Sequence, residues 1–464
     1  MRRTTISATV LLAWAAAAAA TETPAPAGAP GAGEQSNSRA PTTTVNPQSP
    51  SGLDYYSQGG VVVDGVAYFT ANDVCRRPGT ARNEENPCVA AIDLNTLQVI
   101  RRYPFSFTYD SSPLVYQTKD GLWLVIAHEH KRARTVAMNR DSGEVVWTSH
   151  SNQPGSMFFG YSYFLRPDGS RLIFMSAANG LHALSGETGK EAWCVSRRSS
   201  GGVTPCVDQR GGWIYYQCDG QLLKVRAGDG AVLKSTSVAK PSSCVSWNTV
   251  LINDSHGYLV ATYWYGGNEW DGAIRVYDKD LALVWEKTGL PTGKKATLTY
   301  ADGKLVTGSG NQWHARYQGD QWKYIAAYKV HSGEVAWKCD LSKHIYHCIL
   351  NVPYFNGCFY AETQDDVSVM PGVTSKVFRI DGASGKLEEV LDFGHDISSC
   401  ATSIIARGKL LSGDLIHDRL VVTRLAEDAQ GDWPGPFGDP QLHHMAAPTE
   451  PGARIVPMRV EDPR

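Results

Sequence analysis

Two histidines stand one residue apart in the segment AHEHKRAR, as His128 and His130. Alternate residues of an extended segment point to the same side, so the two imidazoles can face one ligand. Imidazole commonly ligates zinc, copper or manganese, which makes a divalent-metal site one hypothesis for this pair. No third ligand is fixed by the spacing. The alternative is a polar loop end that is solvated or hydrogen-bonded at the surface.

Aromatic, basic and histidine side chains are concentrated in three further segments. One reads SGNQWHARYQGDQW, a second reads LSKHIYHC, and a third contains the sequence NEWD. Histidine and arginine offer acid–base and charge-neutralising groups, and tryptophan offers a platform for a sugar ring or another flat ligand. Ordinary loop polarity and packing are the alternative in each segment. The candidate ligand-binding residues are Trp270, Trp313, His314, Arg316, Trp322, His344, Tyr346 and His347.

A repeated pattern supplies the elements that must position these segments. Its clearest copies read AMNRDSGEVVW from Ala137, ALSGETGKEAW from Ala183 and AYKVHSGEVAW from Ala327. Degenerate copies begin at Ala91, Lys224, Val276 and Arg379. Successive starts lie 41 to 52 residues apart, an interval typical of a four-stranded propeller blade.

Each copy follows two β-rich runs joined by a tight turn, as in LTYADGKLVTG and VPYFNGCFYAE. Asp-Gly and Asn-Gly tolerate the positive φ angles of two-residue hairpin turns. Each unit is therefore expected to hold four strands, named A to D in chain order, and strands A to C recur eight times. The sequence predicts an all-β fold, an eight-bladed β-propeller of four-stranded blades. The last blade lacks strand D, which an N-terminal strand around Leu53 to Gln58 is expected to supply, so that no sheet edge stays exposed.

The Ala-x-x-x-x-x-Gly-x-x-x-Trp copies resemble the blade signature of the quinoprotein-like (PQQ-like repeat) β-propeller family. That family includes quinone-dependent alcohol dehydrogenases and binding proteins without a cofactor, so the resemblance is specific for fold rather than activity. It implies that four tryptophans pack between neighbouring blades, namely Trp147, Trp193, Trp285 and Trp337. The dehydrogenases typically carry adjacent cysteines beneath the cofactor and an acidic calcium site. This sequence has no Cys-Cys pair, so pyrroloquinoline quinone is not the expected cofactor.

The loops of a propeller divide between two faces. The B–C and D–A loops gather on one face, and the A–B and C–D turns gather on the other. In this sequence the A–B and C–D turns are short and rich in glycine, whereas the B–C and D–A loops vary in length and carry the unusual residues. Variable loops on a rigid scaffold are typical of a binding surface, and the functional site is expected there.

The two ends of the chain differ in composition from the repeats. Residues 1–20 are predicted to be a secretory signal peptide, with Arg2 and Arg3 before an apolar core and an alanine run. Residues 21–50 are predicted to be a disordered Pro/Ala/Thr-rich linker, 51–427 the propeller, and 428–464 a Pro-rich flexible tail. We therefore expect a secreted, extracellular protein, or a periplasmic one in a bacterium, without a transmembrane segment.

Charge and cysteine content restrict partners and redox state. Charged residues make up 19% of the chain and the net charge is -2, which argues against a nucleic-acid partner. Ten cysteines in an exported chain favour disulfide bonds, with buried free thiols as the alternative. The pairs expected are Cys75 with Cys88, Cys194 with Cys206, and Cys339 with Cys348.

Three functions fit these observations. The first is a secreted binding or scaffold protein that presents the His/Trp/Arg-rich loops to a glycan, a small molecule or a protein. The second is a carbohydrate-active enzyme such as a polysaccharide lyase, whose base and neutralising cation these loops can supply. The third is a quinone-dependent dehydrogenase. No nucleophile or acid pair stands out, and no phosphate-binding, dinucleotide-binding, zinc-protease or serine-hydrolase motif occurs, so the non-catalytic function is favoured.

Overall fold

The computed structural model describes parts of the unit that extends from Arg39 to Arg464. The described residues are 42–45, 60–71, 88–105, 112–129, 133–149, 160–177, 179–197, 204–237, 249–254, 256–265, 272–290, 298–307, 324–343, 348–349, 352–364, 376–392, 404–406, 408–414 and 419–425. They form strands and turns, with no helix among them, and the strands are grouped in eight antiparallel sheets.

Sheets one to four follow one another along the chain, each with four strands. Sheet one contains β2 (Val61–Val63), β3 (Val66–Ala71), β4 (Cys88–Asp93) and β5 (Val99–Pro104). Sheet two contains β6 (Leu114–Gln117), β7 (Trp123–Glu129), β8 (Arg134–Asn139) and β9 (Val145–Thr148). Sheet three contains β10 (Ser162–Leu165), β11 (Arg171–Ala177), β12 (Gly180–Ser185) and β13 (Glu191–Ser196). Sheet four contains β14 (Cys206–Asp208), β15 (Trp213–Cys218), β16 (Gln221–Arg226) and β17 (Val232–Ser237).

Sheets five to eight continue this order. Sheet five contains β18 (Thr249–Asp254), β19 (Gly257–Tyr265), β20 (Gly272–Asp278) and β21 (Leu283–Leu290). Sheet six contains β22 (Leu298–Ala301), β23 (Lys304–Thr307), β24 (Tyr324–Lys329) and β25 (Val335–Asp340). Sheet seven contains β26 (Cys348–Ile349), β27 (Tyr354–Phe355), β28 (Cys358–Gln364), β29 (Lys376–Asp381) and β30 (Leu387–Asp392). Sheet eight contains β31 (Ile404–Ala406), β32 (Lys409–Asp414), β33 (Arg419–Arg424) and the N-terminal strand β1 (Thr42–Val45).

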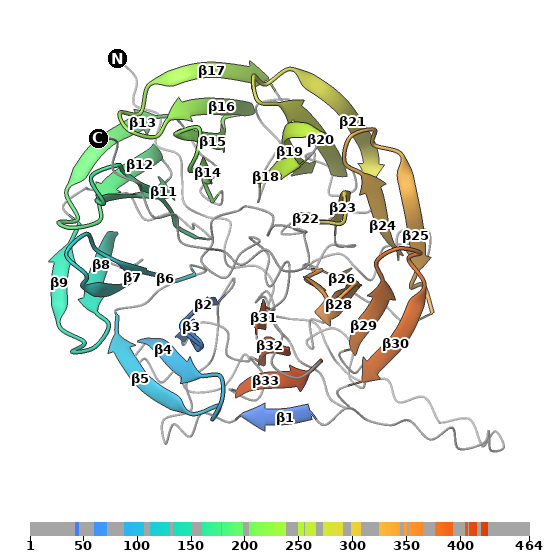
Figure 1. Cartoon of the computed structure of the whole chain (residues 1–464), viewed down its shortest axis with the longest axis horizontal. Coiled ribbons are helices and arrows are strands. Elements are labelled where there is room, and N and C mark those ends of the chain that lie inside the picture. The colour runs from blue at the N-terminus through green and yellow to red at the C-terminus, as the bar shows by residue number, and fades with distance from the viewer. Residues whose placement is uncertain are drawn as a thin grey trace, which may run out of the picture. The chain divides into compact units, whose positions relative to one another are not determined.

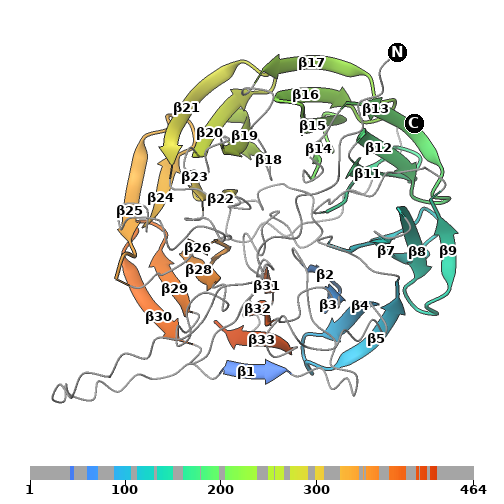
Figure 2. The ribbon, with the colours of Figure 1, turned by 180° about the vertical axis from the view of Figure 1, so that it is seen from behind.

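The eight sheets succeed one another around a ring, with strand A of each sheet nearest the centre and strand D outermost (Figures 1 and 2). Innermost strands of neighbouring sheets contact each other, as β18 does β14 and β22. Apolar residues of adjacent sheets form the core between them; one large cluster joins sheets five, six and seven. This arrangement confirms the predicted all-β propeller.

An N-terminal strand closes the last sheet, but at a different place from the one predicted. β1 pairs antiparallel with β33, with Thr42 opposite Thr423 and Val45 opposite Leu420 (Figure 1). The closing strand therefore lies within the 21–50 segment predicted to be a linker, whereas residues 53–58 lie outside the described residues. Three threonines and a valine favour extended structure, a signal hidden by the surrounding alanine and proline.

Turn chemistry explains why the chain reverses where it does. The A–B turns of sheets one, six and seven have positive φ at both central residues: Asp64 and Gly65, Asp302 and Gly303, and Asn356 and Gly357. Positive φ at both positions defines the hairpin turn that matches strand twist. The predicted Asp302-Gly303 and Asn356-Gly357 hairpins are thus confirmed.

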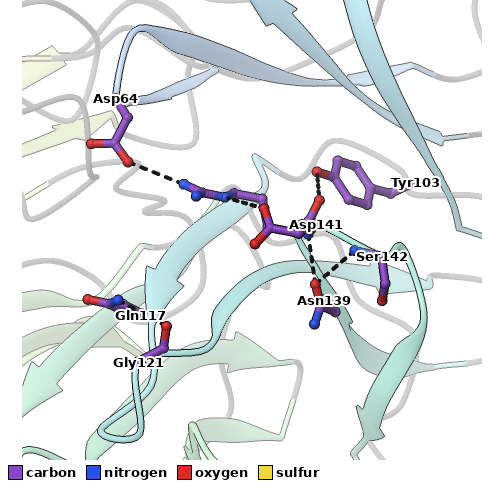
Figure 3. Close-up of polar contacts among 8 residues, drawn as sticks. Asp64, Tyr103, Gln117, Gly121, Asn139, Asp141 and Ser142 are labelled. Atoms are coloured by element: carbon purple, nitrogen blue, oxygen red, sulfur yellow. Dashed lines mark hydrogen bonds and ion pairs between the residues drawn. The ribbon is translucent and has the colours of Figure 1, made fainter.

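The C–D turn of sheet two shows how the repeat ends each strand C. The Asn139 side chain accepts hydrogen bonds from the backbone N–H groups of Asp141 and Ser142, at 2.7 and 2.9 Å (Figure 3). Gly143 then takes a φ of 79°, which a residue without Cβ adopts without strain. Asp93 and Asp381 cap the equivalent turns of sheets one and seven in the same way.

The repeated tryptophans join neighbouring sheets, as the resemblance implies. The Trp147 indole N–H of sheet two donates to the backbone oxygen of Gly186 in sheet three, at 2.9 Å. Trp193, Trp285 and Trp337 make the corresponding bond to the next sheet. Each ring lies against the glycine of the next C–D turn, so closely that a Cβ on Gly189 would be 2.3 Å from Trp147 Cε3. The signature therefore encodes packing between sheets.

Candidate functional site

The two ends of the ring differ in the length of their connections. We call the end with the A–B and C–D connections the turn end, and the end with the B–C and D–A connections the loop end. At the turn end of sheet six, β22 and β23 are joined by residues 302–303, whereas at the loop end β23 and β24 are joined by residues 308–323. Connections at the loop end also vary between sheets, since β15 and β16 are joined by residues 219–220.

The predicted ligand-binding residues belong to connections at the loop end and lie outside the described residues. Trp270 is between β19 and β20. Four candidates are between β23 and β24, namely Trp313, His314, Arg316 and Trp322; three are between β25 and β26, namely His344, Tyr346 and His347. Their positions in space stay a prediction. The strands that carry the last two groups belong to sheets six and seven, which are neighbours in the ring.

A layer of buried polar side chains lies beneath the loop end. We call it the polar layer; it occupies the same register position near the end of strand B in five sheets. Its members are Thr70, His128, Ser176, Gln217 and Glu362. Sequence reasoning missed this layer, although its signal was a polar residue two positions after a buried one in these five B strands.

The polar layer is bonded across the boundaries between sheets. Ser176 Oγ lies 2.9 Å from the Tyr216 hydroxyl of the next sheet. The amide of Gln217 donates to Thr249 Oγ1 at 2.6 Å, also into the next sheet. Ser412 Oγ of sheet eight donates to a carboxylate oxygen of Glu362 in sheet seven, at 2.8 Å. Because buried polar groups are costly unless bonded, these contacts hold the loop-bearing strands in one arrangement.

The histidine of the predicted metal pair that the structure describes is buried. His128 is 2% exposed, near the end of β7, opposite Thr135 of β8. The neighbouring Glu129 forms an ion pair with Arg134 across the same two strands. His130 lies outside the described residues. His128 is therefore part of the polar layer rather than of a solvated loop end.

A group of three metal-ligand side chains occurs elsewhere. Within the described ranges, the one set of at least three such residues with ligand atoms within 4.8 Å of one another is Asp254, His256 and His331, at the turn end. Partial burial by itself raises the pKa of Asp254, but hydrogen bonds from His331, the His256 N–H and Tyr300 outweigh it and lower the pKa overall. Sequence reasoning missed this group because its two segments are far apart in the chain.

Sheet three contains the described arrangement closest to a catalytic one. His182 Nδ1 lies 2.6 Å from Glu191 Oε2, and Cys194 Sγ lies 3.8 Å from His182 Nε2. His182 Nε2 is already within hydrogen-bond distance of Asn179 Oδ1, at 2.8 Å. Burial raises the pKa of the Cys194 thiol, which opposes the thiolate that a cysteine nucleophile needs. The geometry fits a partly buried polar network better than a nucleophile and its base.

Tyr161, a described tyrosine at the loop end, is not placed to act as a base either. The Tyr161 hydroxyl lies 3.3 Å from Thr135 Oγ1 in the core between sheets two and three. Burial raises the pKa of Tyr161 well above its usual range. The phenol therefore keeps its proton at neutral pH, so this tyrosine does not favour the lyase alternative.

The predicted disulfide bonds are not formed by the described cysteines. Cys88, Cys194 and Cys339 have free thiols. The strand order explains why the second predicted pair does not form a disulfide bond. Cys194 is on the outermost strand β13 of sheet three, and Cys206 is on the innermost strand β14 of sheet four. Cys75 lies outside the described residues, as does the side chain of Cys348.

The described residues do not match a quinone site of the dehydrogenase type. The thiols are distributed singly among separate strands, so no described pair of adjacent cysteines offers a platform for the cofactor. The buried acids near the loop end, Glu129 and Glu362, lie in sheets two and seven and are bonded to Arg134 and Ser412. They are therefore not gathered as one acidic calcium site. The part of the chain that the structure describes contains no helix long and apolar enough to cross a membrane.

Comparison with known proteins agrees with this architecture. A family model described as outer membrane protein assembly factor BamB matches residues 89–339, more than half of the chain. No curated protein matches the sequence. BamB from Moraxella catarrhalis is 12% identical with a TM-score of 0.52, over 83% of this chain and 98% of that one.

Two enzymes share the fold at similar sequence identity and TM-score. Quinohemoprotein alcohol dehydrogenase from Comamonas testosteroni is 12% identical with a TM-score of 0.54, over 85% of this chain and 77% of that one. A europium-containing methanol dehydrogenase is 11% identical with a TM-score of 0.53, over 81% of this chain and 84% of that one. Identities this low show the fold alone. The family model, which matches more than half of the chain, shows that this chain belongs to the PQQ-repeat β-propeller family.

Proposed function

We propose that this chain is an exported binding scaffold whose loop end holds a partner protein. The observation that carries the proposal is the contrast between the two ends of a rigid ring. Short turns close one end of the ring, whereas connections of more unequal length extend from the other end. The strands below those connections are joined by the hydrogen bonds of the polar layer. Such a scaffold presents one asymmetric surface without paying the entropy of ordering its strands on binding.

The chemistry of the described residues supports binding over catalysis. The thiol beside His182, Cys194, and the buried phenol at the loop end, Tyr161, both have a pKa raised by burial. The loop segments meanwhile combine tryptophan, arginine and tyrosine, the residue types enriched at the energetic centres of protein interfaces. The family model is named after a factor in outer membrane protein assembly, which favours a protein over a glycan or a small molecule. Export follows from the signal-like residues 1–20.

Site-specific crosslinking tests the proposal. A photo-crosslinking amino acid at Trp313 or Trp322 should capture a partner from the exported protein fraction of the host, and the same group at Asp141, at the turn end, should not. Replacing either tryptophan with alanine should then lower the affinity for the captured partner about 30-fold, because a buried aromatic anchor contributes about 2 kcal/mol to binding.

The matched control is Asp302→Asn. Asp302 has a φ of 47° and accepts a hydrogen bond from Tyr354; asparagine tolerates that backbone and keeps an acceptor, so folding should be preserved. Affinity should stay unchanged in this variant. Crosslinking confined to the turn end, or full affinity in both tryptophan variants, would show that the binding surface is elsewhere. Capture of a glycan instead would overturn the choice of partner.

A further inference from the structure

Three side chains with metal-ligand atoms meet at the turn end, on the boundary between sheets five and six. Asp254 ends β18, and His256 follows two residues later in the same A–B turn. His331 comes from the C–D turn that joins β24 and β25 in sheet six. β18 and β22 are in contact, which brings the two turns together across the boundary.

The distances between these atoms suit one small cation. His331 Nε2 lies 3.1 and 2.9 Å from the two oxygens of Asp254, and His256 Nδ1 lies 3.8 Å from Oδ1. The two imidazole ring centroids are 5.0 Å apart, with the rings tilted by 51°. Ligand bonds of about 2.0–2.1 Å in a tetrahedron place neighbouring ligand atoms about 3.3 Å apart. All three ligand atoms already lie within 4.8 Å of one another, so a rotation of the exposed His256 side chain is enough to bring them around one ion.

An equivalent boundary shows what this position looks like without metal ligands. Between sheets one and two, Asp64 of the A–B turn pairs with Arg140 of the C–D turn at 3.2 Å (Figure 3). A guanidinium cannot lose its proton to ligate a metal. Between sheets five and six, the corresponding A–B turn carries Asp254, and two imidazoles lie beside its carboxylate. His256 adds a second nitrogen ligand that the boundary between sheets one and two does not have.

A second set of contacts orients the carboxylate. The Tyr300 hydroxyl of sheet six donates to Asp254 Oδ2 at 3.0 Å, and the backbone N–H of His256 donates to Oδ1 at 2.9 Å. Hydrogen bonds to a ligating carboxylate fix its direction and commonly accompany metal sites. The carboxylate is partly buried, whereas His256 is 73% exposed and leaves the site open to ions from solvent.

We propose that Asp254, His256 and His331 bind a zinc ion that ties sheet five to sheet six. Two imidazoles and one carboxylate are a donor set suited to Zn²⁺, whereas Ca²⁺ and Mg²⁺ prefer oxygen ligands throughout. Three protein ligands leave the fourth position to water. The ion takes the place of the hydrogen bond between His331 and Asp254. The site is at the end opposite the proposed partner surface, so it does not depend on the proposed function.

Metal analysis of the full chain tests the site. Protein freed of metal with a chelator is equilibrated with Zn²⁺, desalted and assayed for bound zinc. The chain has 13 histidines, so other zinc is expected, and the comparison between variants carries the result. His256→Ala and Asp254→Asn should each hold one zinc per chain fewer than wild type, with at least tenfold weaker binding at this site in competition with a chelating dye. Cobalt in place of zinc should give the visible absorption of a tetrahedral centre in wild type, and this absorption should be weaker in these two variants.

The control variant is Asp64→Asn, which weakens the metal-free ion pair between sheets one and two and should keep the wild-type zinc content. His256→Ala is the decisive change, because its exposed side chain can be removed while the His331–Asp254 pair stays in place. Zinc should raise the thermal midpoint of wild type and of Asp64→Asn more than that of His256→Ala. Equal zinc content, affinity and thermal shift in wild type and His256→Ala would overturn the proposal.

Discussion

Replacing Gly189 with alanine tests whether packing of tryptophan against the next turn holds the sheets together. Gly189 has a φ of 67°, and a Cβ there would be 2.3 Å from Trp147 Cε3. Gly303 has nearly the same φ, 68°, but a Cβ there would have no heavy atom within 4 Å. An L-residue in this left-handed region costs about 1–2 kcal/mol. Overpacking against the indole adds about 1–3 kcal/mol. We expect Gly303→Ala to lose about 1–2 kcal/mol of unfolding free energy and Gly189→Ala about 2–5 kcal/mol.

Urea denaturation of the two variants measures this difference, provided that the slope of each transition matches wild type. A double variant identifies the cause. With Trp147→Leu already present, the smaller side chain leaves room for the Cβ, so Gly189→Ala should cost no more than Gly303→Ala. Equal destabilisation of the two single variants, or an undiminished cost in the Trp147→Leu background, would show that the indole is not the element that joins sheets two and three.

Two further predictions concern the ends of the ring and the thiols. A chain that begins at residue 48 lacks β1 and should unfold at lower urea than one that begins at Arg39, because β33 then has an unpaired edge; equal midpoints would contradict closure by residues 42–45. Burial raises the pKa of Cys88 to about 11, and burial together with Asp340 raises the pKa of Cys339 to about 11. Alkylation at pH 8 should therefore be slow in folded protein and fast in denaturant, and should speed up as the pH rises toward 11, because the thiolate reacts. Detection by mass spectrometry of a disulfide at Cys88 or Cys339 in untreated protein would contradict the prediction that both are free thiols.

The repeating features of the fold could be predicted because they depend on local sequence. A hairpin turn at Asp302-Gly303 needs two residues that accept positive φ, and these residues are adjacent in the chain. In sheets two, three, five and six, the tryptophan two residues after the start of strand D meets the next C–D turn, since these sheets repeat the same offset. Trp147 and Trp337 thus make the same bond from different sheets. Local rules applied repeatedly are enough to specify the ring.

The exceptions depend on one contact that is not repeated. The closing strand was predicted at residues 53–58 instead of 42–45. Closure needs only a short strand that pairs with β33, and both segments lie before the first sheet. The disulfide predictions relied on closeness in sequence. Cys194 and Cys206 are close in the chain, yet the repeat places one on the outer edge of its sheet and the other beside the centre. Spacing along the chain cannot reveal that separation without the topology.

The same reasoning explains why chemistry was harder to locate than architecture. Asp254 and His331 belong to turns whose own sequences are ordinary, and they meet only because the A–B turn of one sheet faces the C–D turn of the next. The repeat also predicts this meeting once the topology is known, since Asp64 and Arg140 meet in the same way. Once the topology is known, pairing each A–B turn with the following C–D turn brings together the two segments that carry Asp254 and His331. The loop-end connections offer no such register because they vary in length. Their residues therefore need the crosslinking experiment, whereas the turn-end cluster follows from the periodicity of the fold.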